Sequence, residues 1–133
     1  MAENTGYKVL VLEDEPSLAK AIEIKLTMHG IEPTIMADGN LALELVSDPK
    51  NKFDGIWLDF DIIGMNGLDF MRHFIQNPHW QECPVLIVSN TGNPELIRQT
   101  IELGAKKWIV KAESHIDATV DELVNLIDDA KRG

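Results

Sequence analysis

Short runs of apolar residues alternate along the chain with longer segments in which apolar residues recur every three or four positions. A short apolar run bounded by turn residues predicts a buried β-strand, whereas the longer period predicts an amphipathic helix. The chain holds five such cycles, a pattern typical of βα units wound around a parallel sheet. The predicted strands are 9–12, 33–36, 55–58, 85–88 and 108–110, each followed by a helix, at 17–28, 41–48, 68–75, 95–103 and 115–131.

Each predicted helix has one apolar face that can cover the sheet. We expect Asp14 to cap the first helix, Pro16 to lie in its first turn, and His29 and Gly30 to end it. Continuously apolar strands are expected where helices cover both faces of a sheet, and right-handed crossovers then restrict the topology. The residues expected to point inward are Leu18, Ile22, Leu26, Leu41, Leu45, Val46, Leu68, Met71, Ile75, Val120, Leu123, Val124 and Ile127.

Length, charge and cysteine content narrow the class of protein. At 133 residues the chain fits one domain, which we expect to span 1–133. Twenty-two Asp and Glu against twelve Lys and Arg give a formal net charge of -10, which repels phosphate backbones and anionic lipids. We therefore expect no direct contact with nucleic acid or membrane. The single Cys83, an N-terminus without a secretory signature and the lack of a spanning apolar run favour a cytoplasmic protein.

Chemically active residue types follow the predicted strands where each strand ends. Glu13 and Asp14 follow the first strand, and Asp59 follows the third. Ser89 follows the fourth strand and Lys111 the fifth. In open α/β sheets ligands bind beyond the carboxyl ends of the strands, so these side chains are expected to converge. Three carboxylates at such a site repel one another and attract a cation, and oxygen-only ligation favours Mg²⁺.

This combination suggests phosphoryl transfer. A carboxylate beside a bound Mg²⁺, an ammonium and a hydroxyl is suited to attack phosphorus and form an acyl phosphate. We expect Asp59 to be the nucleophile, because it ends the central strand. Lys111 would balance the phosphoryl charge and Ser89 would donate its hydroxyl to a phosphoryl oxygen.

Four segments, in order and over essentially the whole chain, resemble the motifs of response-regulator receiver domains of two-component signalling: VLVLEDEP, GIWLDFDIIGMNGLD, VLIVSN and GAKKWIVKA. The resemblance implies a flavodoxin-like α/β fold with strand order 2-1-3-4-5, for which the chemotaxis receiver is a standard example. It implies a stand-alone, chemotaxis-regulator-like receiver without an output domain and not a conventional enzyme. The implied Mg²⁺ ligands are the side chains of Glu13, Asp14 and Asp59 and the backbone carbonyl of Asp61.

The resemblance also implies a switch and partners. Ser89 is the hydroxyl residue that moves toward the phosphoryl group, and Trp108 stands where receivers carry an aromatic switch residue. The surface that changes would be 94–131, where a downstream protein reads the state. The phosphodonor would be a phosphohistidine on a sensor histidine kinase or on a phosphotransfer protein of a phosphorelay.

Several residues depart from the usual receiver pattern. Ala112 replaces the Pro that commonly follows the active-site Lys, so a cis peptide there would be costly and the approach of Lys111 can differ. Ile63 and Asn90 replace a Pro and a small residue and are expected to narrow the approach to Asp59. Trp108 is larger than the usual Tyr or Phe, which is expected to favour an outward position.

Two alternative functions remain compatible with the sequence. One is a phosphate-independent receiver that serves only as a docking platform. The other is an aspartyl phosphatase, because Asp59-Phe60-Asp61 after an apolar strand resembles the DxD nucleophile of haloacid-dehalogenase phosphatases. The phosphatase is disfavoured because that family places its DxD on the first strand, whereas Glu13 and Asp14 here precede the DxD by a whole βαβ stretch.

Overall fold

A computed structural model describes residues 5–80 and 82–132. It contains the five-stranded parallel sheet that the sequence pattern predicts, in the order β2-β1-β3-β4-β5 that the receiver resemblance implies. The strands are β1 (Lys8–Leu12), β2 (Glu32–Met36), β3 (Gly55–Asp59), β4 (Val85–Ser89) and β5 (Lys107–Val110). The helices are α1 (Pro16–Met28), α2 (Gly39–Ser47), α3 (Gly67–Phe74), α4 (Pro94–Glu102) and α5 (Ile116–Arg132). Two short 3-10 helices, η1 (Pro78–Trp80) and η2 (Lys111–Glu113), were not predicted.

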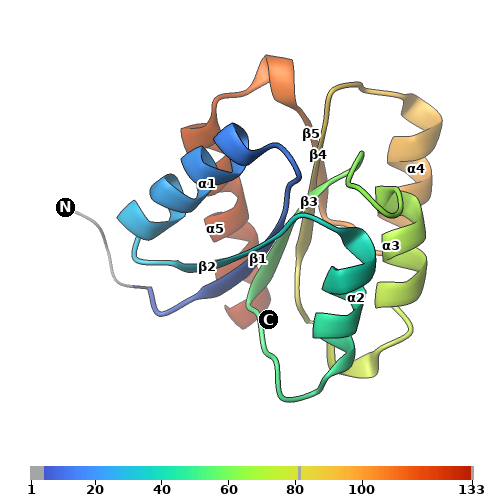
Figure 1. The fold of residues 1–133 in the computed structure, drawn as a ribbon, viewed down its shortest axis with the longest axis horizontal. Coiled ribbons are helices and arrows are strands. Elements are labelled where there is room, and N and C mark those ends of the chain that lie inside the picture. Colours follow the sequence, from blue (N-terminus) through green and yellow to red (C-terminus); the bar gives the residue numbers. More distant parts are fainter. Residues whose placement is uncertain (1–4, 81, 133) are drawn as a thin grey trace.

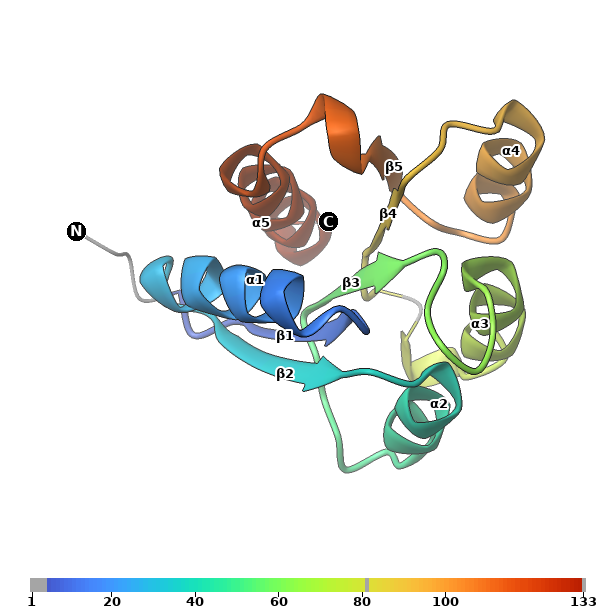
Figure 2. The same cartoon turned by 45° about the horizontal axis from the view of Figure 1, so that its top comes forward.

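Helices cover both faces of the sheet, with α1 and α5 on one face and α2, α3 and α4 on the other (Figures 1 and 2). Side chains alternate along each strand and divide the core accordingly. Val9, Val11 and Trp57 pack with α1 and α5, whereas Leu10, Leu12 and Leu58 pack with α2 and α3. The continuously apolar strands of the sequence therefore serve two cores, one on each side of the sheet.

β2 lies at one edge of the sheet, which explains its composition. Pro33 pairs in register with Val9, and an edge strand tolerates the missing N–H of proline because one of its sides has no neighbouring strand. Gly30 follows the end of α1 with a φ of 73°, in the left-handed region that glycine adopts without a Cβ penalty. The predicted end of the first helix at His29 and Gly30 is confirmed.

Three local predictions were wrong. Asp14 does not cap α1: the N-cap is Glu15, whose side chain makes no capping bond, while Pro16 occupies the first turn as expected. Leu41 is 52% exposed, because α2 turns Ala42 and Val46 to the core instead. Ile75 is 45% exposed, because α3 ends at Phe74 and places Ile75 beyond its last turn.

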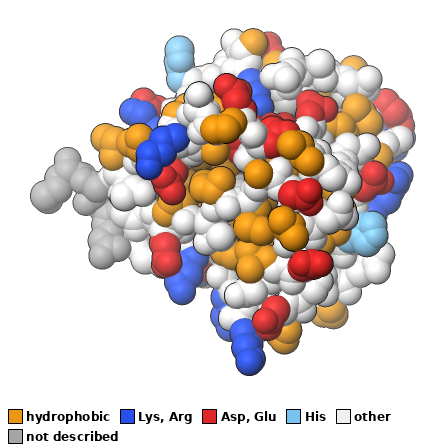
Figure 3. Space-filling view, viewed as in Figure 1, with side chains coloured by type: hydrophobic (Ala, Val, Ile, Leu, Met, Phe, Trp, Pro, Cys, Tyr) orange, Lys and Arg blue, Asp and Glu red, His pale blue; other side chains and the backbone are white. Residues whose placement is uncertain are grey.

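Within the described residues no helix is both long and apolar enough to cross a membrane. Residues 1–4, part of the N-terminal segment in which no secretory signal is predicted, lie outside the described range. Acidic and apolar side chains are interspersed over the face seen in Figure 3. On that face the acidic side chains are therefore scattered and do not form one continuous patch.

Candidate functional site

The register of the sheet brings the acidic residues together. Leu12 of β1 pairs with Leu58 of β3, so Glu13 and Asp59, each one residue further, lie at the same level of the carboxyl edge. One carboxylate oxygen from each of Glu13, Asp14 and Asp59 lies within 4.8 Å of the others. Glu13 and Asp59 are buried, and Asp14 is half-buried. The predicted convergence of the two strand ends is therefore present in the structure.

Lys111 joins this cluster from the end of β5, an edge strand of the sheet. Its Nζ donates to Asp59 Oδ2 at 2.9 Å and to Glu13 Oε1 at 3.3 Å. The residue begins η2 directly after β5, and the described residues contain no cis peptide. Lys111 thus reaches the acids although Ala112 stands where receivers usually carry Pro.

The buried charges change the protonation of the cluster. Burial of the Glu13 carboxylate, and the negative charge of Asp59 beside it, raise the pKa of Glu13 to about 7. Burial lowers the pKa of Lys111, but its hydrogen bond to Asp59 and the charges of both acids outweigh burial, so that this pKa is raised. The single ammonium of Lys111 therefore neutralises only part of the negative charge of the three acids. A divalent cation could neutralise the rest.

Backbone N–H groups hold the two innermost carboxylates in place. The Asp61 N–H donates to Asp59 Oδ1 at 3.0 Å, and the Glu15 N–H donates to Glu13 Oε2 at 3.2 Å. Each bond spans two residues and fixes the side chain against its own loop. The strand-end carboxylates are therefore oriented before any ligand binds.

Ser89 and Trp108 lie on the neighbouring strands and are connected through one loop residue. Ser89 ends β4 and is buried, and its hydroxyl oxygen accepts from the Thr91 N–H at 3.2 Å. The Thr91 carbonyl in turn accepts from Trp108 Nε1 at 3.0 Å. The Trp108 ring is half-buried and packs on Phe60, with ring centroids 5.0 Å apart, instead of standing clear of the surface.

Sequence reasoning missed a connection between the loops after β2 and β3. Asp38 forms a parallel bridge with Ile63, the Gly39 N–H donates to Ile63 O at 2.7 Å, and Asn40 Nδ2 donates to Gly64 O at 3.3 Å. The loop that holds Asp61 is therefore fastened to the start of α2. The sequence Asp38-Gly39-Asn40 predicts only a turn. Its partners are backbone carbonyls of a distant loop, and a sequence pattern does not reveal such contacts.

Residues 9–123 match the family described as the response regulator receiver domain. The chain belongs to this family. Among curated relatives of this receiver, chemotaxis protein CheY-3 of Vibrio cholerae is 27% identical over 109 residues, which cover 81% of this chain and 82% of CheY-3. Response regulator ArlR of Staphylococcus saprophyticus is 33% identical over 104 residues, or 78% of this chain and 45% of ArlR.

Some relatives are much longer than the receiver. It spans only 18% of the two-component response regulator ORR26 of Oryza sativa, with 27% identity over 106 residues and 80% of this chain. A further relative is named as a DNA-binding response regulator, MtrA of Mycolicibacterium smegmatis, 37% identical over 104 residues that cover 78% of this chain and 43% of MtrA. These relatives do not support the expectation of a protein without nucleic-acid contact.

Solved structures agree with the fold of the receiver. Vibrio cholerae chemotaxis protein CheY4 matches with a TM-score of 0.81 and 26% identity, over 90% of this chain and 98% of CheY4. A CheY-like receiver from Methanospirillum hungatei matches with a TM-score of 0.84 over 95% of this chain and 97% of that chain. At 16% identity the second likeness concerns the fold alone. The strand order and the acidic cluster agree with the receiver family, and Asp59 ends the third strand and not the first strand, where the phosphatase family places its DxD.

Proposed function

We propose that this receiver takes a phosphoryl group onto Asp59 from a phosphohistidine of a sensor histidine kinase or phosphotransfer protein. The observation that carries the proposal is the 2.9 Å contact of Lys111 Nζ with Asp59 Oδ2, beside a buried acidic cluster that can hold a divalent cation. Carboxylate, ammonium and clustered acids from three separate segments meet at the one edge where parallel sheets bind ligands.

The residues divide the work of transfer by their chemistry. A carboxylate oxygen of Asp59 attacks phosphorus, the new O–P bond forms as the N–P bond of the donor breaks, and the donor imidazole leaves with the electron pair. Lys111 moves its ammonium from the carboxylate to the arriving phosphoryl oxygens and balances their charge. Ser89, at the end of the adjacent strand, donates its hydroxyl to another phosphoryl oxygen.

Mg²⁺ is the proposed cofactor. Its ligands would be the side chains of Glu13, Asp14 and Asp59 and the backbone carbonyl of Asp61. The donor set fits, because it is made of oxygen atoms on a partly solvated edge, where Mg²⁺ retains some of its water. The ion would supply positive charge that neutralises the acids and the transferring phosphoryl group.

The Ser89–Thr91–Trp108 connection supplies the proposed switch. When the Ser89 hydroxyl turns to the phosphoryl group, the Thr91 N–H loses its acceptor, and Thr91, whose carbonyl accepts from Trp108 Nε1, is free to move. The loop between β4 and α4 and the ring of Trp108 then change together. A downstream protein would read this change on the 94–131 surface, and a cytoplasmic location fits such partners.

Intact mass spectrometry tests the proposal directly. Incubation with Mg²⁺ and a small acyl phosphate is expected to add the mass of one phosphoryl group per chain, and hydroxylamine is expected to remove it, since it cleaves acyl phosphates. Asp59→Asn abolishes the addition, whereas Asp121→Asn, an equal loss of charge at an exposed site of α5, leaves it intact.

The same assay separates the alternatives. Continued release of inorganic phosphate from a small phosphate ester, far beyond one per chain, would favour the phosphatase. A wild-type chain that stays unmodified while it binds a histidine kinase would favour the docking platform. Either result would end the phosphoacceptor proposal.

A further inference from the structure

Ile63 lies in the loop between β3 and α3, four residues after Asp59, at the carboxyl edge of the sheet (Figure 2). Its side chain is 57% exposed, the largest exposed fraction of any large apolar side chain in the described part of the chain. A single exposed aliphatic side chain is ordinary on a protein surface. What distinguishes Ile63 is its fixed backbone and its position beside the proposed phosphoacceptor.

The backbone at Ile63 is fastened to α2 and to the core. The Ile63 carbonyl accepts from the Gly39 N–H at 2.7 Å, and the residue pairs with Asp38 in an isolated parallel bridge. The preceding side chain, Ile62, is buried in the core. Isoleucine is branched at Cβ and has few accessible rotamers. Little conformational entropy is therefore lost when a partner covers the side chain of Ile63.

The depth of Asp59 decides which partner covers Ile63. The Asp59 side chain is buried, so a phosphohistidine on a protein reaches it only when the surrounding protein surface contacts the loops at this edge. Four residues of chain span at most about 14 Å. A standard interface of about 800 Å² per partner, if circular, has a radius of about 16 Å. An interface centred on Asp59 therefore includes Ile63.

Apolar contact is needed here because charge does not favour the approach of the donor. The chain carries a formal net charge of -10, and the acids beside Asp59 include the exposed Asp61 and the half-buried Asp14. These charges repel the phosphoryl group that the donor carries. Burial of an aliphatic side chain is independent of charge and stabilises the complex at short range.

We propose that Ile63 is an apolar contact for the phosphodonor protein and contributes to its selection. The donor places an apolar side chain against Ile63 while its phosphohistidine faces Asp59. This inference rests on the proposed phosphoacceptor function and adds a residue by which the donor is recognised. Because Ile63 touches the donor protein and not the transferred group, it acts on binding and not on the transfer step.

Two phosphodonors separate recognition from chemistry. One is an autophosphorylated histidine kinase that phosphorylates the wild-type chain, and the other is a small acyl phosphate with Mg²⁺. With the kinase, Ile63→Ser is expected to lower kcat/KM about fivefold to tenfold, mainly through a higher KM, because the exposed part of the isoleucine no longer becomes buried. With the acyl phosphate the rate is not expected to fall, since a small donor needs no contact with residue 63.

Ile63→Val and Ile75→Ser are the matched controls. Ile63→Val keeps an apolar side chain branched at Cβ and is expected to retain most of the kinase reaction. Ile75→Ser makes the same exchange at a side chain that is 45% exposed. Ile75 borders a cavity with Val85 and Lys106, at the edge where β4 and β5 begin, so its kinase reaction is expected to match the wild type.

Equal kcat/KM for the wild type and Ile63→Ser with the kinase would overturn the proposal. A fall with both donors would also overturn it, because Ile63 would then act on the active site or on the fold. An equal fall in Ile75→Ser would reveal a general effect of surface apolarity and would overturn it too. A wild-type chain that takes phosphate from neither donor would instead refute the proposed function.

Discussion

Lys111 supplies the positive charge nearest to Asp59, and it competes there with any bound cation. Its Nζ contacts both Asp59 and Glu13, the two buried acids of the proposed Mg²⁺ site. Unit charges about 4 Å apart interact by about 4 kcal/mol at an effective dielectric of about 20, so the lysine offsets much of the attraction for Mg²⁺. In the proposed transfer the same ammonium would balance the charge of the arriving phosphoryl group. Cation binding and phosphorylation are therefore expected to respond to its loss in opposite directions.

Lys111→Met is predicted to bind Mg²⁺ more tightly because the competing positive charge is removed. The gain in affinity is limited to about tenfold, since solvent screens most of the Coulomb energy. Its phosphorylation rate is predicted to fall by at least about a hundredfold, as for other groups that stabilise transferred charge. Calorimetric titration with Mg²⁺ and the mass assay measure the two effects. Lys107→Met, which removes a half-buried lysine paired with Glu122, controls for net charge. Weaker Mg²⁺ binding in Lys111→Met would contradict the competition.

Glu13 is expected to make the proposed Mg²⁺ binding dependent on pH near neutrality. Its pKa is raised to about 7 by burial and by Asp59. A raised acid pKa means that the folded, metal-free protein holds this proton more tightly than the unfolded chain does. That contribution to stability is complete below the unfolded pKa and is lost as pH rises through about 7. A Mg²⁺ ion at this site would need the ionised carboxylate and would therefore displace the proton.

The Mg²⁺ dissociation constant is accordingly predicted to fall about tenfold between about pH 6 and about pH 8, because one proton leaves one ligand over that range. Calorimetric titrations at several pH values measure it. Glu13→Gln should bind Mg²⁺ more weakly and with little dependence on pH in this interval. A wild-type affinity that is flat across the interval would show that Glu13 does not lose a proton on binding.

At the scale of elements, the loop after β3 depends on α2 for its position. Gly64 in this loop has a φ of 95°, and a Cβ there would lie 2.8 Å from Asn40 Nδ2 and 2.9 Å from Asp38 Oδ1. Asp38 is the N-cap of α2 and accepts from the Asn40 and Leu41 N–H groups. A side chain at Gly64 would thus disturb both the cap and the connection between the loops.

Gly64→Ala is predicted to lower the free energy of unfolding by about 2 to 3 kcal/mol, of which about 1 to 2 kcal/mol is backbone strain at positive φ. Gly104→Ala separates the two contributions, because Gly104 has a φ of 112° but no atom within 4 Å of its Cβ position. Urea unfolding should show a loss that is larger for Gly64→Ala by at least about 1 kcal/mol. Equal losses would mean that the fit between the loops contributes nothing to stability.

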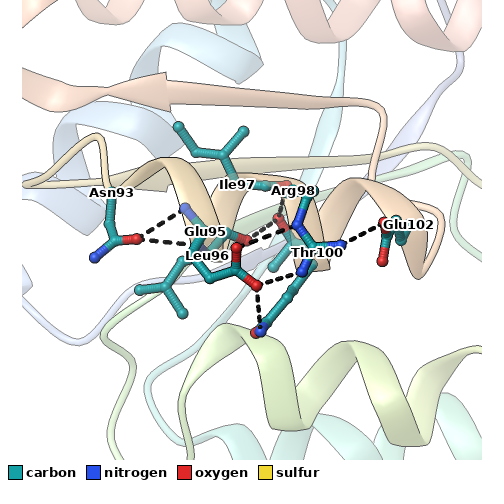
Figure 4. A network of polar contacts seen from close by, with 8 residues as sticks. Asn93, Glu95, Leu96, Ile97, Arg98, Thr100 and Glu102 are labelled. Atoms are coloured by element: carbon teal, nitrogen blue, oxygen red, sulfur yellow. Dashed lines mark hydrogen bonds and ion pairs between the residues drawn. The ribbon is translucent and has the colours of Figure 1, made fainter.

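The fourth helix presents a surface whose charges are largely paired within the helix. Figure 4 shows Arg98 between Glu95 and Glu102, with Asn93 capping the first turn through the Glu95 and Leu96 N–H groups. Hydrogen bonds from Arg98 and Gln99 lower the pKa of Glu95. Exposed ion pairs of this kind contribute little to stability. Their main effect is that the charged groups of α4 are already paired with one another when a partner protein approaches.

The sequence was sufficient to predict the helices and strands of this molecule, but not the contacts between its loops. The convergence of Glu13, Asp59 and Lys111 follows from five parallel strands whose carboxyl ends share one edge, whereas the strand order came from the resemblance to receiver domains. Leu41 was misplaced because a helical period does not distinguish which of two apolar rows faces the sheet, and small Ala42 takes the buried position. The Ile63–Gly39 contact is made by backbone atoms, and the unpaired Trp57 N–H depends on packing.

At the scale of the whole molecule, the three tryptophans report on different regions. Trp108 is tied through Thr91 to Ser89, Trp57 lies in the core beside the proposed active site, and Trp80 donates to Val46 O behind α2 and α3. A change that passes from Asp59 through Ser89 and Thr91 to the 94–131 surface is expected to alter Trp108. The same change has no connection through these hydrogen bonds to Trp80.

Addition of Mg²⁺ and beryllofluoride, a mimic of the phosphoryl group, is therefore predicted to shift the indole N–H resonance of Trp108 and leave that of Trp80 in place. Asp59→Asn should abolish the shift because the mimic no longer binds. Ser89→Ala is the decisive variant: the mimic should still bind Asp59, but Trp108 should no longer respond, since the Thr91 N–H has already lost its acceptor. A normal Trp108 shift in Ser89→Ala would show that the signal reaches the 94–131 surface by another route, and a shift of Trp80 would show that the whole core rearranges.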